Sequence, residues 1–170
     1  MERRAIAVQG TPTPISEQLR SMPDVPTLFT VTIDTEEEWD WNAGWPTSDL
    51  SVTNIGQLPR FQAICDRYNV AVTYFTDLAV LETPESREII LDLAERPRVE
   101  IGMHIHPWNT PPIDAAPVTT RSTFLQNLSR AQVRQKMASV YERFLNCGLR
   151  PTSFRAGRYS TSLDVQDFLR

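Results

Sequence analysis

The chain contains two histidines, His104 and His106, with one residue between them. Residues two apart on a β-strand project from the same face, so both imidazoles can approach one ion. The acids Asp34 and Glu36 have the same spacing and follow another apolar segment. Two imidazoles and one carboxylate leave positions open on a divalent cation for water and substrate. These residues therefore predict a hydrolytic metal site with Glu36, His104 and His106 as ligands.

A structural role for the histidine pair is the alternative, with one imidazole capping a strand and the other in solvent. The acids favour the metal, because they end a second predicted strand of the same fold. Arg155 also follows an apolar segment, where a guanidinium is costly to bury unless a carboxylate receives it. Pairing with Asp34 would make that acid a base kept off the metal. A simple exposed ion pair is the other interpretation.

More polar and aromatic residues follow Glu36. The acids of this loop are interpreted as a solvated face, and they are Glu37, Glu38 and Asp40. The same loop contains three indoles, of Trp39, Trp41 and Trp45. Indoles beside a site either stack on sugar rings or attach their loop to the fold, and the sequence leaves both interpretations open. Asp77 precedes an apolar run and is interpreted as a helix cap.

Four short apolar segments alternate with helical patterns along the chain. The predicted strands are residues 27–34, 70–76, 98–106 and 151–157, and the predicted helices are 55–68, 84–95, 130–147 and 160–170. In the first helix the apolar spacing is carried by Leu58, Phe61, Ile64, Cys65 and Tyr68. Ser129 and Gln132 predict a capping box, and Gly148 predicts a glycine cap. This alternation is typical of a parallel α/β sheet or barrel, whose ligand site lies at the carboxyl ends of the strands.

The length of 170 residues suits one domain, which we assign to residues 27–170. Residues 1–26 contain four prolines and are predicted to form an irregular arm. The net charge of −4 and the scattered basic residues argue against a surface for nucleic acid or an anionic membrane. We find no secretory signal or transmembrane run, so a cytoplasmic location is the default expectation. Cys65 and Cys147 are expected to be reduced thiols, and the oligomeric state is left open.

Three segments together resemble a known family. TIDTEEEW (residues 32–39), EIGMHIHPW (100–108) and FRAGRY (154–159) are similar, in this order, to the motifs of the NodB-homology polysaccharide deacetylases, carbohydrate esterase family four. The similarity extends from Thr27 to about Tyr159. The resemblance implies a distorted (β/α)7 barrel, present here in part, and the metal-dependent removal of N- or O-acetyl groups from a sugar polymer. It also implies a divalent metal, zinc first and cobalt, nickel or manganese as alternatives, and an acetylated carbohydrate as partner.

The resemblance also implies roles for individual residues. Carried over by position, Asp34 would deprotonate the metal-bound water, His104 would bind the metal and Arg155 would hold the base. The backbone N–H near Tyr159 would form part of the oxyanion hole. The expected enzyme is a metal-dependent hydrolase of C–N bonds other than peptide bonds.

The chain departs from the family pattern at three points. Thr35 stands where a second aspartate is usual, which moves the carboxylate ligand to Glu36, and Trp108 stands where the second histidine is usual, so His106 serves instead. A third histidine, the general acid of the family, is missing, which predicts a barrel truncated at its C-terminus and without its leaving-group acid. A deacetylase barrel that is inactive as this truncated chain is therefore one alternative. Two further alternatives remain: an amide or cyclic-imide hydrolase of a small molecule on the same barrel, and a non-catalytic glycan-binding barrel fragment.

Overall fold

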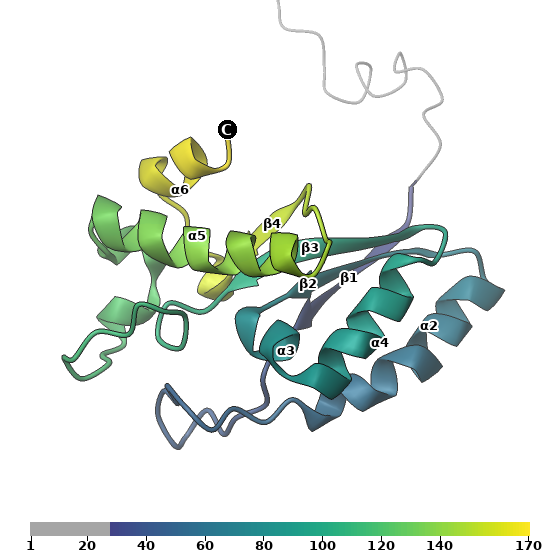
Figure 1. Ribbon diagram of the computed structural model, residues 1–170, viewed down its shortest axis with the longest axis horizontal. Coiled ribbons are helices and arrows are strands. Elements are labelled where there is room, and N and C mark those ends of the chain that lie inside the picture. Colours follow the sequence, from purple (N-terminus) through teal and green to yellow (C-terminus); the bar gives the residue numbers. More distant parts are fainter. Residues whose placement is uncertain (1–27) are drawn as a thin grey trace, which may run out of the picture.

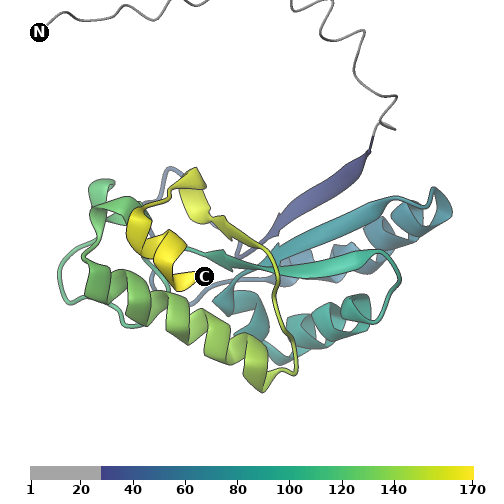
Figure 2. The same ribbon diagram turned by 90° about the horizontal axis from the view of Figure 1, so that it is seen from above.

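The computed structural model describes residues 28–170, so the arm predicted over residues 1–26 lies outside the described part of the chain. Four strands form one parallel sheet in the order β1-β2-β3-β4 (Figure 1). The strands are β1 Thr30–Thr35, β2 Ala71–Thr76, β3 Val99–Ile105 and β4 Phe154–Ala156. The sheet is twisted and its strands diverge, as in part of a barrel (Figure 2). The prediction of a parallel α/β fold is therefore confirmed.

The helices follow the predicted alternation and are α2 Leu58–Arg67, α3 Leu78–Glu82, α4 Pro84–Ala94, α5 Arg130–Asn146 and α6 Leu163–Phe168. Short 3₁₀ turns are η1 Thr53–Gln57, η2 Arg121–Thr123, η3 Leu125–Asn127 and η4 Gly157–Tyr159. The longer helices α2, α4 and α5 lie on the same side of the sheet (Figure 2). Within residues 28–170, no helix has the length and apolar character needed to cross a membrane.

The sheet has one apolar face and one polar face. Side chains such as Val72, Tyr74 and Ile105 point to the helices and are buried in the core. The alternate positions form the other face, which carries Thr32, Asp34, Thr73, Phe75, Glu100, His104 and Arg155. Because polar groups of the predicted site alternate with core residues along the same strands, the packing of the core fixes the direction of the site residues.

The register of the strands aligns the site residues across the sheet. Asp34 is paired with Phe75, which is paired with Gly102, and His104 is paired with Arg155. A Cβ atom at Gly102 would lie 2.7 Å from the Phe75 ring and 2.6 Å from Ser153 Oγ, in the loop before β4. Glycine at this position therefore allows the phenyl ring to lie across the polar face beneath Arg155.

The local signals of the helices agree with the structure except in α2. Ser129 and Gln132 form the predicted capping box of α5, and Gly148 ends that helix with a φ of +78°. In α2, however, the predicted apolar positions Ile64 and Tyr68 are exposed. Gln62 is buried instead, because its Oε1 accepts a hydrogen bond of 2.8 Å from the hydroxyl of Tyr74 in the core.

Candidate metal centre

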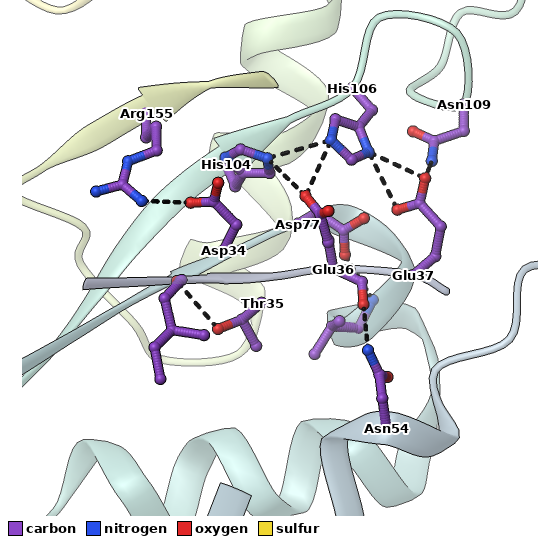
Figure 3. A network of polar contacts seen from close by, with 12 residues as sticks. Asp34, Thr35, Glu36, Glu37, Asn54, Asp77, His104, His106, Asn109 and Arg155 are labelled. Atoms are coloured by element: carbon purple, nitrogen blue, oxygen red, sulfur yellow. Dashed lines mark hydrogen bonds and ion pairs between the residues drawn. The ribbon is translucent and has the colours of Figure 1, made fainter. Parts of the chain in front are cut away.

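Two imidazoles and one carboxylate meet at the carboxyl ends of β1 and β3 (Figure 3). Glu36 Oε2 lies 3.0 Å from His104 Nε2 and 3.1 Å from His106 Nε2. The two Nε2 atoms are 3.2 Å apart. His104 is the sixth residue of β3 and His106 directly follows the strand, so the predicted spacing does bring both rings to one point.

The triangle of ligand atoms has the dimensions of a metal site. Ligand atoms about 2.0–2.1 Å from a tetrahedral zinc ion are about 3.4 Å from one another, close to the separations of 3.0–3.2 Å found here. The histidines are 1% and 3% exposed, whereas the carboxylate of Glu36 reaches the surface of a cleft. Glu36, His104 and His106 could therefore hold a cation and leave its fourth position toward solvent.

Glu37 corrects the interpretation of its loop as a solvated acidic face. Its side chain is buried at 2% exposure, and its carboxylate lies 2.9 Å from His106 Nδ1. Asn109 Nδ2 donates a second hydrogen bond of 2.7 Å to the same oxygen. Because β1 ends at Thr35, the chain is free to direct two consecutive carboxylates at the two nitrogens of one imidazole. A carboxylate on the outer nitrogen orients a metal-binding histidine.

The remaining acids of the loop fit the original interpretation. Asp40 and Glu38 are exposed. Asp40 accepts hydrogen bonds from Asn42, and Glu38 accepts them from Ser51, Thr53 and the backbone of Asn54. These contacts close the loop on itself and leave the cleft to Glu36. Thr35 is buried on the helix side of the sheet, so the position of the usual second aspartate faces away from the imidazoles.

The charges of the cluster depend on one another. Burial alone would raise the pKa of Glu36, but hydrogen bonds with His104 and His106 outweigh it and lower the pKa to about 2. Burial would likewise lower the pKa of His106, but its hydrogen bonds with Glu36 and Glu37 raise the pKa to about 10. His106 is therefore a cation between two carboxylates at neutral pH, and a metal must displace its proton from Nε2.

Asp77 has the predicted capping role and a second contact. Its Oδ1 accepts a hydrogen bond of 3.0 Å from the backbone of Val80 at the start of α3. The residue is buried beside Glu37, and burial together with this neighbouring carboxylate raises the pKa of Asp77 well above its usual value. A neutral Asp77 carboxyl can share its proton with Glu37, which keeps two buried acids in contact without two negative charges.

Asp34 and Arg155 form a separate ion pair beside the cluster. Arg155 Nη1 donates to Asp34 Oδ1 at 2.5 Å, and its Nη2 donates to Thr32 Oγ1 at 2.6 Å. The guanidinium carbon lies 4.2 Å from the centre of the Phe75 ring, which fixes its plane. Both charged side chains are partly exposed, unlike the histidines. The predicted contact of Arg155 with Asp34 is thus present.

A cleft of about 360 Å³ connects the two groups. Its walls include Asp34, Glu36, Trp41, His104, His106, Trp108, Phe124, Ala156, Gly157, Arg158 and Tyr159. Trp41 and Tyr159 are 63% and 82% exposed as residues. The cleft therefore has ionisable groups and flat, accessible aromatic rings.

The three indoles of the loop lie around a fourth indole, that of Trp108, and differ in their contacts. Trp108 is buried and stacks on His106, with 4.2 Å between ring centres and 15° between planes. Trp39 contacts both rings edge-on and so attaches its loop to the imidazole cluster. Trp45 packs against Trp108, whereas Trp41 extends from this group into the cleft. Trp39 and Trp45 thus attach the loop, whereas Trp41 lines the cleft, and its contact with a ligand stays a prediction.

The turn after β4 places Tyr159 at the cleft. Arg158 and Tyr159 have φ values of +57° and +49°, a left-handed conformation that non-glycine residues rarely adopt. A Cβ atom on Gly157 would overlap the His106 ring and lie 2.7 Å from the carbonyl oxygen of Ile105. Glycine therefore lets this turn lie directly against the candidate metal ligands.

Sequence reasoning did not identify Glu37, Asn109, Trp108, Gly157 and Arg158 as parts of the site. Four of these residues lie within the motif segments TIDTEEEW, EIGMHIHPW and FRAGRY, which were the available signal, whereas Asn109 lies outside them. Comparisons of the chain with protein-family models, curated proteins and solved structures each find no match.

Proposed function

We propose that this protein is a metal-dependent hydrolase that removes acetyl groups from a carbohydrate, on a partial barrel of the NodB-homology type. The observation that carries the proposal is the convergence of Glu36 Oε2, His104 Nε2 and His106 Nε2 within 3.2 Å at the wall of a cleft. Buried histidines and a carboxylate in this arrangement suit zinc, with cobalt, nickel and manganese as alternatives. The order of the three motifs and the strand order β1-β2-β3-β4 support the barrel type.

Each residue of the cleft has its own role in the proposed reaction. Glu36, His104 and His106 would hold the ion, which when bound polarises the acetyl carbonyl and lowers the pKa of water from about 16 towards about 7. Glu37 holds the His106 ring from its outer nitrogen. Arg155 contacts one oxygen of Asp34, Oδ1, and so holds this base away from the ligand triangle. The other oxygen of Asp34 remains to accept the proton of the attacking water.

Within residues 28–170, Asp34 is the group placed to return that proton as well. The sequence contains two histidines, and both belong to the ligand triangle. A residue that accepts a proton as the nucleophile forms can donate it to the leaving group when the acyl bond breaks. In this scheme one carboxylate acts as base and then as acid, and Arg155 keeps its orientation through both steps.

The cleft favours a sugar over a small cyclic imide. Trp41 and Tyr159 present exposed aromatic rings, and such rings provide flat apolar surfaces on which sugar faces can stack. The backbone N–H of Tyr159 would contribute to the oxyanion hole, in a turn that lies against the His106 ring. A hydrolase of a small amide or cyclic imide is the second candidate, because the volume of about 360 Å³ also suits such a molecule.

The test measures metal content and acetate release together. The 170-residue protein is freed of metal, titrated with zinc, and assayed on a panel of acetylated oligosaccharides and cyclic ureides. We expect one zinc per chain and acetate release that Asp34→Asn lowers about 10²- to 10⁴-fold. The control Asp40→Asn makes the same change at an exposed acid of the loop after β1 and should leave the rate unchanged. Absence of stoichiometric metal, or turnover of ureides alone, overturns the proposal.

A further inference from the structure

Arg158 lies in the same cleft as the candidate metal ligands but takes no part in the scheme above. It belongs to η4, the turn after β4, three residues beyond Arg155. Its guanidinium carbon is 4.3 Å from the centre of the Phe124 ring and 5.0 Å from that of Trp45. Two aromatic rings from two other loops thus hold the guanidinium at the cleft by cation–π contacts.

The hydrogen-bonding groups of Arg158 have no acceptor among residues 28–170. No ion pair or hydrogen bond links the side chain to another described residue, and its Nε is buried without a partner. Arg155 differs in this respect, since it donates to both Asp34 and Thr32. Of the three guanidinium nitrogens only Nε is buried without a partner, and burying an N–H donor without an acceptor is costly. The arrangement therefore leaves the guanidinium of Arg158 available to a ligand in the cleft.

The charge of the cleft favours an anionic ligand. Asp34 is paired with Arg155, and Glu36 contacts the histidines, so neither carboxylate forms an ion pair with Arg158. The planar fork of arginine matches the two oxygens of a carboxylate. Stacking by Trp45 and Phe124 restricts the guanidinium before any ligand binds, which lowers the entropy lost on binding.

We propose that Arg158 binds a carboxylate of the substrate and thereby selects acetylated acidic sugars, such as uronate-containing oligosaccharides, over neutral ones. This inference rests on the proposed function and specifies its substrate class. Because Arg158 and the ligand triangle line one cleft, the acetyl group and the carboxylate would belong to the same sugar or to adjacent sugars.

The experiment compares binding of two probes to the zinc-loaded protein. The probes are an acetylated oligosaccharide that contains uronate and a neutral acetylated oligosaccharide of equal length, and binding is followed by titration calorimetry. We expect Arg158→Gln to weaken binding of the acidic probe about tenfold or more and to change binding of the neutral probe less than about twofold. Arg158→Lys keeps the charge but loses the planar fork, so it should restore only part of the affinity.

The control is Arg150→Gln, which makes the same change of charge at an exposed arginine before β4. Equal affinity of the wild type for both probes, or an equal loss for both in Arg158→Gln, overturns the inference. A sulfated sugar is the third probe, and a clear preference for sulfate over carboxylate also overturns it. Thermal melting of each variant verifies that the fold is retained.

The proposed function can fail separately. If the protein binds the acidic probe through Arg158 but releases acetate from no sugar, the hydrolase proposal fails and the role of Arg158 stands. If acetate is released from acidic and neutral sugars at equal rates by the wild type and by Arg158→Gln, the hydrolase proposal stands and the role of Arg158 is wrong.

Discussion

The polar rim of the sheet contains two groups of ionisable side chains that differ in burial. The imidazole cluster, formed by Glu36, Glu37, His104 and His106, contains two almost fully buried rings that contact carboxylates. The arginine pair, formed by Asp34 and Arg155, is partly open to the cleft. Buried charges need a partner, and the carboxylates supply it at His106, whereas an accessible ion pair can exchange protons with water. Under the proposed function, the imidazole cluster binds the cation and the arginine pair transfers the proton.

The largest expected effect is the loss of metal when the imidazole cluster is broken. In His104→Gln one ligand of three is lost. Zinc at about a hundred times its Kd should stabilise the wild type by about 2.7 kcal/mol, or roughly 5–10 °C in Tm, and should not stabilise the variant. Scanning calorimetry with and without zinc measures the shift. An equal shift in both proteins would show that the ion binds elsewhere.

Breaking the arginine pair should separate catalysis from binding. Asp34→Asn removes the proposed base while Glu36, His104 and His106 remain, so the rate of acetate release should fall about 10²- to 10⁴-fold with zinc content unchanged. Metal analysis and the acetate assay on one sample test this division. If the variant also loses its zinc, Asp34 is a ligand and the two groups are a single site.

The pH dependence of zinc affinity sharpens the comparison further. The pKa of His106 is raised to about 10, so a metal must displace one proton at every pH below that value. Affinity should therefore fall about a hundredfold from pH 8 to pH 6, or tenfold per unit. An imidazole with the ordinary pKa of 6.5 would lose only about fourfold over this interval. Zinc titrations at both pH values distinguish the two cases.

The metal-free protein should show the opposite trend. Because the folded pKa of His106 is raised, the stabilisation from its proton is complete below pH 6.5 and is lost as the pH rises towards 10. The pKa of Glu36 is lowered to about 2, so its contribution is present above pH 4.5 and is lost as the pH falls towards 2. These groups thus make their full contributions together between about pH 4.5 and 6.5, where zinc affinity is falling.

Glu37 tests whether the outer carboxylate of the imidazole cluster matters. In Glu37→Gln the charge beside His106 Nδ1 disappears, and changes of such partners typically reduce metal affinity about 10- to 100-fold. Competition with a chelator of known affinity measures the change. Glu38→Gln is the matched control, because the neighbouring acid is exposed and contacts Ser51 and the start of η1 rather than the histidines. Similar losses in both variants would remove the distinction between these acids.

The sequence predicted the parts of the site that depend on strand periodicity. Alternation along β1 and β3 placed Asp34 and His104 on the polar face, and the order of the elements placed Arg155 within reach of Asp34. The parallel sheet and the cap of α5 were also predictable, because local patterns determine them. The metal-binding role of Glu36, His104 and His106 stays a prediction.

Other features depend on how the chain bends after a strand ends. Glu37 and Glu38 are adjacent and chemically identical, yet one is buried against His106 and the other is exposed. No periodicity applies in a loop, so sequence reasoning treated them alike. The prediction that Ile64 and Tyr68 belong to the apolar face of α2 is wrong for a related reason. The hydroxyl of Tyr74 gives Gln62 a buried partner, which helical spacing alone cannot reveal. In both cases a partner distant in sequence decides the burial.

The smallest expected effect concerns the aromatic wall of the cleft. Trp41 is the exposed member of the indole group, and its removal in Trp41→Ala should weaken binding of acetylated oligosaccharides about two- to tenfold. Zinc affinity should not change, because the indole that stacks on His106 is that of Trp108. Calorimetric titration with sugar and with zinc gives both quantities. A loss of zinc affinity in Trp41→Ala would mean that the exposed indole supports the imidazole cluster, whereas unchanged sugar binding would move the ligand surface away from this wall.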